Sequence, residues 1–278
     1  MINLENLVFG YSRHYRLFDN LSLQLGAGNI YGLLGKNGTG KTTLIKLMSG
    51  LLYPQGGTCS LFGNNASKRY PTDLSDLFIV PEEFALPSVK MDEFVKMNSP
   101  FYPKFSETGF RAYLSDFEVE GNKKLHTLSF GQKKKFLLSF ALATNTKLLL
   151  LDEPTNGLDI PSKSQFRKTV ARSLTDEKSI LISTHQARDL ESLIDNIIIL
   201  DNGKILFNQP GSMATQKLFF GKTKHLDNSA QILYKEETLG GYKFVMPATG
   251  QEESVLDLEL FFNAIVGNPG AIAPYFNN

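Results

Sequence analysis

The sequence has a single cysteine, Cys59, among 278 residues, so an internal disulfide is excluded and a reducing compartment fits. The net charge of +1 gives no electrostatic reason to expect nucleic-acid binding. No apolar run reaches the roughly 18 residues of a membrane-spanning helix. The first residues, MINLENLVFGYS, lack the basic and apolar regions of a signal peptide. We therefore expect a chain that does not itself cross a membrane.

The patterns that are present predict an α/β fold. The runs KLLLLD, SILIST and NIIILD alternate with helical segments, which is typical of a parallel sheet covered on both faces. Residues 1–32 alternate like strands, and residues 41–50 predict a helix. Residues 83–127 contain two helical segments, 91–98 and 107–117, and no evident strand. Beyond residue 206 we expect two strands, a helix capped by Ser254 that stops near Gly267, and a loose end.

A glycine-rich segment lies between an expected strand and the helix at 41–50. It reads GLLGKNGTGKTTL and contains the pattern G-x-x-x-x-G-K-T, from Gly35 to Thr42. Gly35, Gly38 and Gly40 leave successive backbone N–H groups free to bind phosphate. In such a loop Lys41 reaches the β- and γ-phosphates and the Thr42 hydroxyl binds Mg²⁺. The alternative is an ordinary glycine turn, but the strand and helix on either side favour a nucleotide site.

Polar residues follow two of the expected strands where each strand ends. Asp152 and Glu153 follow KLLLL, and His185 follows ILIST. Ligands of open parallel sheets bind at this edge. Asp152 can hold Mg²⁺ through water, Glu153 can polarise an attacking water, and His185 can hold that water and Glu153 in place. An acidic turn and a structural histidine are the alternatives.

The segment HTLSFGQKKKFLLSFAL, residues 126–142, predicts a helix that begins after Ser129. Ser129 and Gln132 have capping-box spacing, and apolar residues then recur with helical spacing. Three lysines, 133–135, fall in the first turn, where the helix dipole is already positive. One interpretation is a solvated helix start, and the other is a site for an anion.

The ordered motifs together resemble those of a known family. The phosphate loop, LSFGQ, LLLLDEP, GLD and STH resemble the nucleotide-binding subunits of ATP-binding cassette (ABC) transporters, over about residues 2–220. The resemblance implies a P-loop NTPase fold with a mostly parallel sheet, an N-terminal antiparallel β subdomain and a helical subdomain. We expect the ABC ATPase domain at 1–205 with its helical insertion at about 83–145, and a small α+β extension at 206–278.

By resemblance, the cofactors are ATP and Mg²⁺. Asp152 resembles the magnesium carboxylate, Glu153 the catalytic base and His185 the switch histidine. Tyr11 resembles the aromatic residue that stacks on adenine, although Tyr15 is nearby. The remaining nucleotide-binding positions implied are Gly35, Asn37, Gly38, Thr39, Gly40, Lys41, Thr42 and Thr43, with Lys41 also catalytic.

LSFGQ resembles the family signature LSGGQ. In that family two cassettes pair head-to-tail, and each signature helix points its N-terminus at the γ-phosphate held by the other chain. Ser129, Gly131 and Gln132 would then bind nucleotide in trans, which favours the anion-site interpretation. The lysines at 133–135 are assigned no contact and are expected to tune the helix start or stay solvated.

Two positions depart from the family pattern. Phe130 replaces the middle glycine of the signature, so its backbone would approach phosphate without the conformational freedom of glycine. Glu82 stands where the family usually has a glutamine that contacts Mg²⁺ and water, and it adds negative charge near the triphosphate. Glu83 is a weaker candidate for that position, and an ordinary turn acid is the alternative.

The resemblance implies an ATP-hydrolysing subunit that dimerises around two Mg-ATP and drives a separate transmembrane permease. Such a subunit is peripheral on the cytoplasmic face of the membrane, and we expect no nucleic-acid partner. The second cassette is either another copy of this chain or a relative. DLELFFNAIV near the C-terminus resembles the tail of exporters of the ABC-2 type. Apolar residues of the insertion suit a docking groove or a local core: Met91, Phe94, Phe101, Tyr102 and Phe105.

Other classes of function remain open at this stage. The departures at positions 82 and 130 are compatible with a nucleotide-dependent regulatory module that has little ATP turnover. The presence of Glu153 and His185 argues against this alternative. Soluble ABC ATPases of DNA repair or translation would need a long coiled coil or two cassettes in one chain, and we expect neither here.

Overall fold

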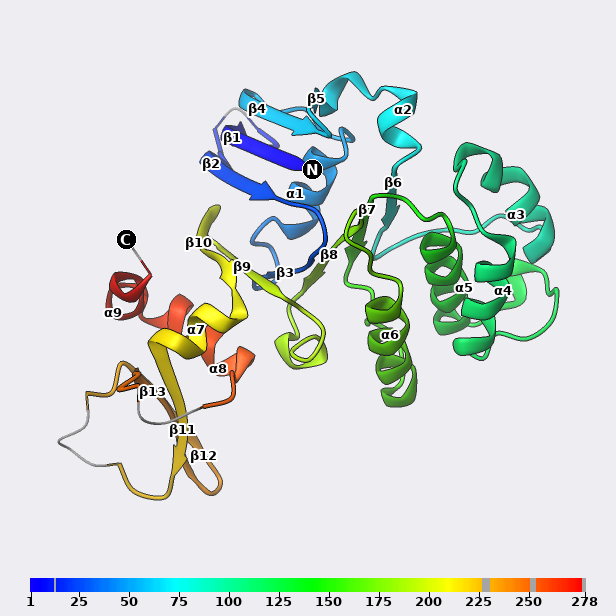
Figure 1. Ribbon diagram of the computed structural model, residues 1–278. Helices are drawn as coiled ribbons and strands as arrows, with labels where there is room; N and C mark the ends of the chain where they lie inside the picture. The colour runs from blue at the N-terminus through cyan, green and yellow to red at the C-terminus, as the bar shows by residue number, and fades with distance from the viewer. Residues whose placement is uncertain (13, 227–230, 251–253, 277–278) are drawn as a thin grey trace.

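The computed structural model describes residues 1–12, 14–226, 231–250 and 254–276. In this part of the chain, a six-stranded sheet forms the centre of the expected α/β fold (Figure 1). Its strands are β3 (Ile30–Leu34), β6 (Leu77–Val80), β7 (Leu148–Asp152), β8 (Ser179–Thr184), β9 (Asn196–Asp201) and β10 (Lys204–Pro210). They run in the order β10-β9-β3-β8-β7-β6, parallel except for β10, which pairs antiparallel with β9.

The central strands are buried on both faces, as the apolar runs predict. In β7, Leu148 and Leu150 pack into the core beneath helix α1 (Lys41–Met48). Leu149 and Leu151 point the other way, into the core beneath helices α5 (Phe130–Ala143) and α6 (Ile160–Arg172). This alternation is the period-2 geometry of a strand between two layers of helices.

An antiparallel sheet covers α1 from the other side, as the fold expectation requires. Its strands are β1 (Ile2–Phe9), β2 (Phe18–Leu25), β4 (Gly56–Leu61) and β5 (Asn64–Asn65), in the order β2-β1-β4-β5. Leu4, Leu23 and Leu61 of this sheet share one core with Leu44 and Leu47 of α1. The helix that follows the phosphate loop is therefore held between two sheets.

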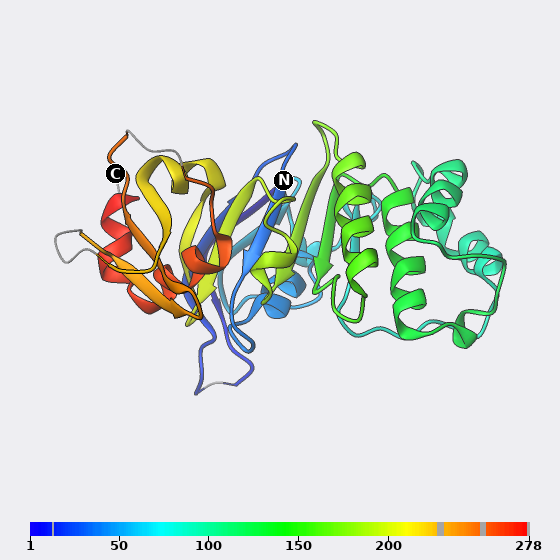
Figure 2. The same ribbon diagram turned by 90° about the horizontal axis from the view of Figure 1, so that it is seen from below.

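The helical subdomain lies beyond β6, at the opposite end of the molecule from the C-terminal residues (Figures 1 and 2). After the short α2 (Pro71–Leu74) and β6, the expected helices are observed as α3 (Met91–Asn98) and α4 (Glu107–Asp116). Phe140 of α5 contacts an aromatic cluster made of Phe78, Phe94, Tyr102, Phe105 and Phe110. Met91 is fully buried, so it belongs to this local core and not to an open groove, whereas Phe101 is 69% exposed.

The C-terminal part begins on the main sheet. β10 spans residue 206, where the extension was expected to start, and pairs with β9 up to Pro210. The elements that follow are α7 (Gly211–Lys217), β11 (Leu218–Thr223), β12 (Tyr234–Thr238), β13 (Gly241–Pro247), α8 (Leu258–Gly267) and α9 (Pro269–Ile272). Three strands form a sheet in the order β11-β13-β12, and its apolar residues share a core with Ile197 and Ile199 of β9.

Two expectations for this region are wrong. Helix α8 is capped by Asp257, whose Oδ1 accepts from the Leu260 N–H, whereas the Ser254 hydroxyl accepts a hydrogen bond from the Phe220 N–H. The end of the chain is helical in α9 and in the 3₁₀ turn at Ala273–Tyr275, because Ile272 is buried in the same core.

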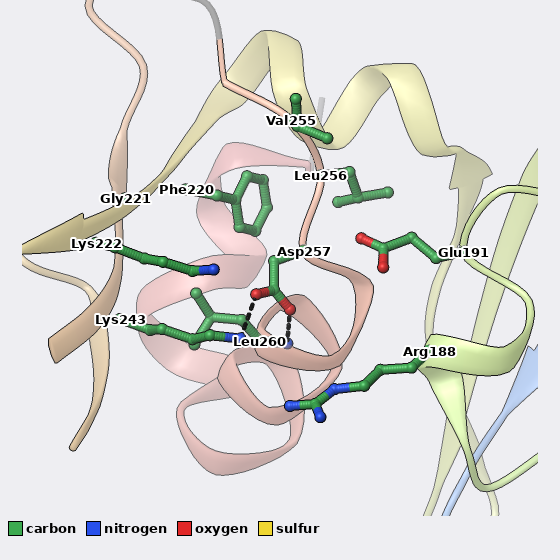
Figure 3. Close-up of a pocket in the computed structure, with 10 residues that line it drawn as sticks. All are labelled: Arg188, Glu191, Phe220, Gly221, Lys222, Lys243, Val255, Leu256, Asp257 and Leu260. Atoms are coloured by element: carbon green, nitrogen blue, oxygen red, sulfur yellow. Dashed lines mark hydrogen bonds and ion pairs between the residues drawn. The ribbon is translucent and has the colours of Figure 1, made fainter. Parts of the chain in front are cut away.

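Ion pairs and hydrogen bonds join α8 to the cassette around a cavity of about 750 Å³ (Figure 3). Figure 3 shows Asp257 bonded to Lys243, with Glu191 and Arg188 on the opposite wall. The Glu191 carboxylate accepts from the Leu258 N–H at 3.2 Å, and Arg188 forms an ion pair with Glu259.

Within the described ranges, no helix has the length and apolar character needed to cross a membrane.

Candidate nucleotide site

The phosphate loop connects β3 to α1, and the Lys41 side chain at its end is hydrogen-bonded to the start of the loop. The Lys41 ammonium donates to the carbonyl oxygens of Gly35 at 2.8 Å and Lys36 at 3.2 Å. A Cβ at position 35 would lie 2.6 Å from Thr39 Oγ1, so only glycine fits there. Gly40 has a φ of 104°, in the region that favours glycine. The loop therefore has the open backbone that a phosphate ligand needs.

The two carboxylates at the end of β7, those of Asp152 and Glu153, have different hydrogen-bond partners. Asp152 accepts from the Thr42 hydroxyl at 2.6 Å and from the hydroxyl of Ser183, its register partner on β8. Thr42, at the start of α1, thus meets Asp152 at the end of β7, as the sequence predicts. Both carboxylates are buried, at 2% exposure for Asp152 and 3% for Glu153.

The Glu153 carboxylate lies between the expected histidine and the loop lysine. Its Oε1 is 2.9 Å from His185 Nδ1 and 3.5 Å from Lys41 Nζ. Its Oε2 is buried and has no hydrogen-bond partner within the described residues. Glu153 also lines the cavity in front of the loop, where its carboxylate can meet a ligand.

A cavity of about 650 Å³ opens above the loop. The residues that line it are Tyr11, Tyr15, Leu17, Asn37, Gly38, Gly40, Lys41, Thr42, Thr43, Glu82, Glu153, Asn156 and His185. The Tyr11 hydroxyl lies 3.0 Å from Thr43 Oγ1, while its ring is 66% exposed; Tyr15 is equally exposed. Gly35, Thr39 and Asp152 do not line the cavity itself: Gly35 and Asp152 contact the lining residues Lys41 and Thr42, and Thr39 lines a neighbouring hollow.

Glu82 reaches the same cavity from the segment after β6. Its Oε1 accepts from the Asn156 amide at 3.0 Å, which fixes the carboxylate beside Glu153. Glu83 is not among the residues that line the cavity, which favours Glu82 over it as the residue at this position.

The oxygen atoms at this edge suit Mg²⁺. Mg²⁺ is held by one or two protein oxygens together with substrate phosphates and water. The Thr42 hydroxyl and the Asp152 carboxylate are already in contact, and Glu82 adds a carboxylate on the cavity wall. The donor set therefore fits a magnesium ion that is bound together with a nucleotide.

The signature segment has the predicted cap. Ser129 Oγ accepts from the Gln132 N–H at 3.2 Å, and Gln132 Oε1 accepts from the Ser129 N–H at 3.1 Å. Ser129, Gly131 and Gln132 do not line the cavity described above. Gly131 packs tightly, since a Cβ there would lie 3.2 Å from the Gly157 carbonyl oxygen.

Phe130 has the backbone of a first helical residue and no positive φ, so glycine's freedom is not required at this position. Its ring stacks on Phe84 with centroids 5.8 Å apart. A Cβ at position 157 would lie 2.8 Å from this ring, so Gly157 makes room for it. The aromatic ring therefore joins the signature segment to the loop after Glu153.

The expectation that all three signature lysines lack a specific contact is wrong for Lys134. Its side chain is fully buried, and its ammonium donates to the Glu153 carbonyl oxygen at 3.0 Å. Sequence reasoning also missed Ser183 and Asn156. Ser183 could have been found from its place beside Asp152 at the end of an apolar strand, and Asn156 from its position three residues after Glu153.

Comparison with known proteins decides the family. The family model described as ABC transporter matches residues 18–156. The ABC transporter ATP-binding protein YtrB of Bacillus subtilis (strain 168) is 30% identical over 207 residues, which is 74% of this chain and 70% of YtrB. The chain belongs to the ABC transporter family. ATP-binding cassettes of this family are ATPases, so the expectation of an ABC-type ATPase is confirmed.

Other ABC proteins support the same conclusion. The bacitracin transport ATP-binding protein BcrA of Bacillus licheniformis is 32% identical over 199 residues, which is 69% of this chain and 64% of BcrA. The alignments span about two thirds of these curated relatives. An ATP-binding subunit of an ABC transporter superimposes with a TM-score of 0.69 at 24% identity, over 78% of this chain and 92% of that chain. The expected P-loop cassette fold is thereby confirmed.

Proposed function

We propose that this ABC cassette binds two Mg-ATP at the interface of a dimer, hydrolyses ATP, and drives a separate transmembrane permease that exports its substrate. The observation that carries the catalytic part is the Glu153 carboxylate. One of its oxygens is held between His185 and Lys41, and the residue lines the phosphate-loop cavity.

Hydrolysis requires that water attacks the γ-phosphorus while the bond to the ADP oxygen breaks. The Glu153 carboxylate orients the water and accepts its proton, and His185 keeps the carboxylate in place. Lys41 and the backbone N–H groups around Gly38 and Gly40 neutralise the charge on the transferred phosphoryl group. Tyr11 lies at the cavity mouth, where its ring can stack on adenine. These groups supply positioning and charge, which are the main demands of phosphoryl transfer.

A magnesium ion would be held by Thr42 and Asp152, with the Glu82 carboxylate as a further acceptor on the cavity wall. Bound there, it would supply positive charge to the β- and γ-phosphates. The charge of Glu82 opposes the triphosphate, and the Asn156 amide offsets part of that repulsion.

The signature acts in trans in this proposal. Ser129, Gly131 and Gln132 lie at the N-terminus of a 14-residue helix and do not line their own chain's cavity, so they are available to a nucleotide on a second cassette. A structural neighbour, the ATP-binding cassette MJ0796, is dimeric in a post-hydrolysis state bound to ADP and Pi; it has a TM-score of 0.66 at 21% identity, over 76% of this chain and 98% of that chain.

Export and the membrane partner rest on the relatives. Besides BcrA, they include a Nod factor export ATP-binding protein I of Neorhizobium galegae, 28% identical over 218 residues, which is 75% of this chain and 62% of the relative. We propose the same direction for this chain, a place on the cytoplasmic face of the membrane beside a permease, and no nucleic-acid partner.

The decisive test is light scattering after size exclusion of Glu153→Gln with and without Mg-ATP, beside the ATPase rate of the wild type. We expect ATP to trap a dimer of the variant and the wild type to turn over. Ser129→Arg added to that variant should abolish the dimer, whereas Ser212→Arg, an exposed serine of α7, should not. A variant that binds ATP and stays monomeric contradicts the homodimer. A wild type that binds ATP without turnover supports the regulatory module instead.

A further inference from the structure

Lys134 is a buried cation next to the site, and no step of the proposed function uses it. It is fully buried in the second turn of α5, and its ammonium donates to the Glu153 backbone carbonyl. The rings of Phe130 and Phe84 lie 5.5 Å and 6.0 Å from the ammonium. A buried charge is costly unless it is paired and hydrogen-bonded, so this lysine is held in place by specific partners.

The residue that Lys134 contacts has an unusual backbone. Glu153 has a φ of 44°, in the left-handed region that residues other than glycine rarely occupy. Such a conformation persists only where the surroundings determine it. The Glu153 N–H donates to the backbone oxygen and the hydroxyl of Ser183, and its carbonyl accepts from Lys134 and from the Asn156 N–H. Lys134 is the charged donor in this set, and it comes from a different element.

We propose that Lys134 is a positioning residue for ATP hydrolysis: by binding the Glu153 carbonyl, it holds the left-handed backbone that points the carboxylate at His185 and the phosphate-loop cavity. The inference rests on the proposed role of Glu153. Lys134 also lies five residues after Ser129, the residue proposed to contact the ATP of the other chain. One side chain thus links the signature of a chain to the hydrolytic carboxylate of the same chain.

The test compares Lys134→Met with Lys178→Met. Lys178 is equally buried but lies at the start of β8, at the opposite end of that strand from the site. We expect Lys134→Met to lower kcat about tenfold, the loss of one charge-assisted hydrogen bond, with KM and the equilibrium dissociation constant for Mg-ATP within about twofold of wild type. Lys178→Met should keep the wild-type kcat. Lys134→Arg keeps the charge and the donors, so its kcat should exceed that of Lys134→Met.

Three outcomes would overturn the inference. The first is a Lys134→Met protein with kcat within twofold of wild type. The second is a joint fall of kcat, ATP affinity and melting temperature, which indicates a general structural role. The third is a folded Lys134→Arg protein no faster than Lys134→Met. Glu153→Gln separates the two proposals: if it hydrolyses ATP at the wild-type rate, the proposed base is wrong. If it is inactive while Lys134→Met is fully active, only the positioning role fails.

Discussion

Lys178 is the second deeply buried lysine of the cassette, and its environment predicts an unusual stability effect. Its side chain is 4% exposed, and its ammonium has no hydrogen-bond partner among the described residues. Burial lowers the pKa of Lys178 from 10.5 to about 8. Folding therefore disfavours the charged form of this side chain, and nothing nearby compensates it.

The size and sign of the effect follow from that pKa. A tenfold change in proton affinity corresponds to about 1.4 kcal/mol. The fall of the Lys178 pKa from 10.5 to about 8 therefore costs the folded protein about 3 kcal/mol while the lysine is protonated in both states. Between pH 8 and pH 10.5 the unfolded chain holds the proton and the folded chain does not, so this contribution to stability rises with pH.

Lys178→Met removes the buried charge, and we expect it to raise the free energy of unfolding at pH 7 by about 1–3 kcal/mol. At pH 10 the gain should shrink below about 1 kcal/mol, because the wild-type lysine is then neutral in the folded state. Urea unfolding at both pH values measures the effect. Lys168→Met, on the exposed face of α6, is the matched control and should stay within about 0.5 kcal/mol of wild type. A gain of equal size at both pH values, or a loss at pH 7, would refute the reasoning.

Three further predictions concern the site and the cores. Glu82→Gln removes a negative charge from the cavity, and equilibrium titration should show the dissociation constant of Mg-ATP falling about fivefold, or about 1 kcal/mol; weaker binding would contradict the proposed repulsion. Phe140→Ala opens the aromatic cluster and should cost about 3–5 kcal/mol in urea unfolding, whereas the exposed Phe101→Ala should cost less than about 1. Burial raises the pKa of the Cys59 thiol to about 12, so Ellman's reagent at pH 8 should label it only in urea; labelling of the native protein at the rate of a free thiol would show that Cys59 is accessible.

The parts of the fold that the sequence predicts well are those written in local spacing. The leucines of KLLLLD alternate between two cores because successive residues of a strand face opposite layers of the fold. The phosphate loop was readable because its glycines and Lys41 act within eight consecutive residues. Asp152, Glu153 and His185 were placed together by one rule, that the carboxyl ends of parallel strands meet at one edge.

The wrong predictions concern side chains whose position is decided by a tertiary contact and not by the local sequence pattern. Ser254 is a good helix cap by composition, but its hydroxyl accepts from Phe220, and Asp257 caps the helix instead. Lys134 was expected, with its neighbours, to tune the helix start or stay solvated, and no contact was assigned to it. Helical spacing had placed it on the same face as Leu137, Leu138 and Ala141, all of which are buried. The helical periodicity therefore predicts burial of Lys134 correctly. It cannot predict the partner, because the Glu153 carbonyl that accepts from the ammonium lies in a distant loop.

Two contacts connect the C-terminal part of the chain to the segment that follows His185. His185, which holds the Glu153 carboxylate, is followed within six residues by Arg188 and Glu191, and both are bonded to the start of α8. Glu153, the proposed base, is therefore held at its backbone by Lys134 of α5 and at its carboxylate by His185, whose segment is bonded to α8.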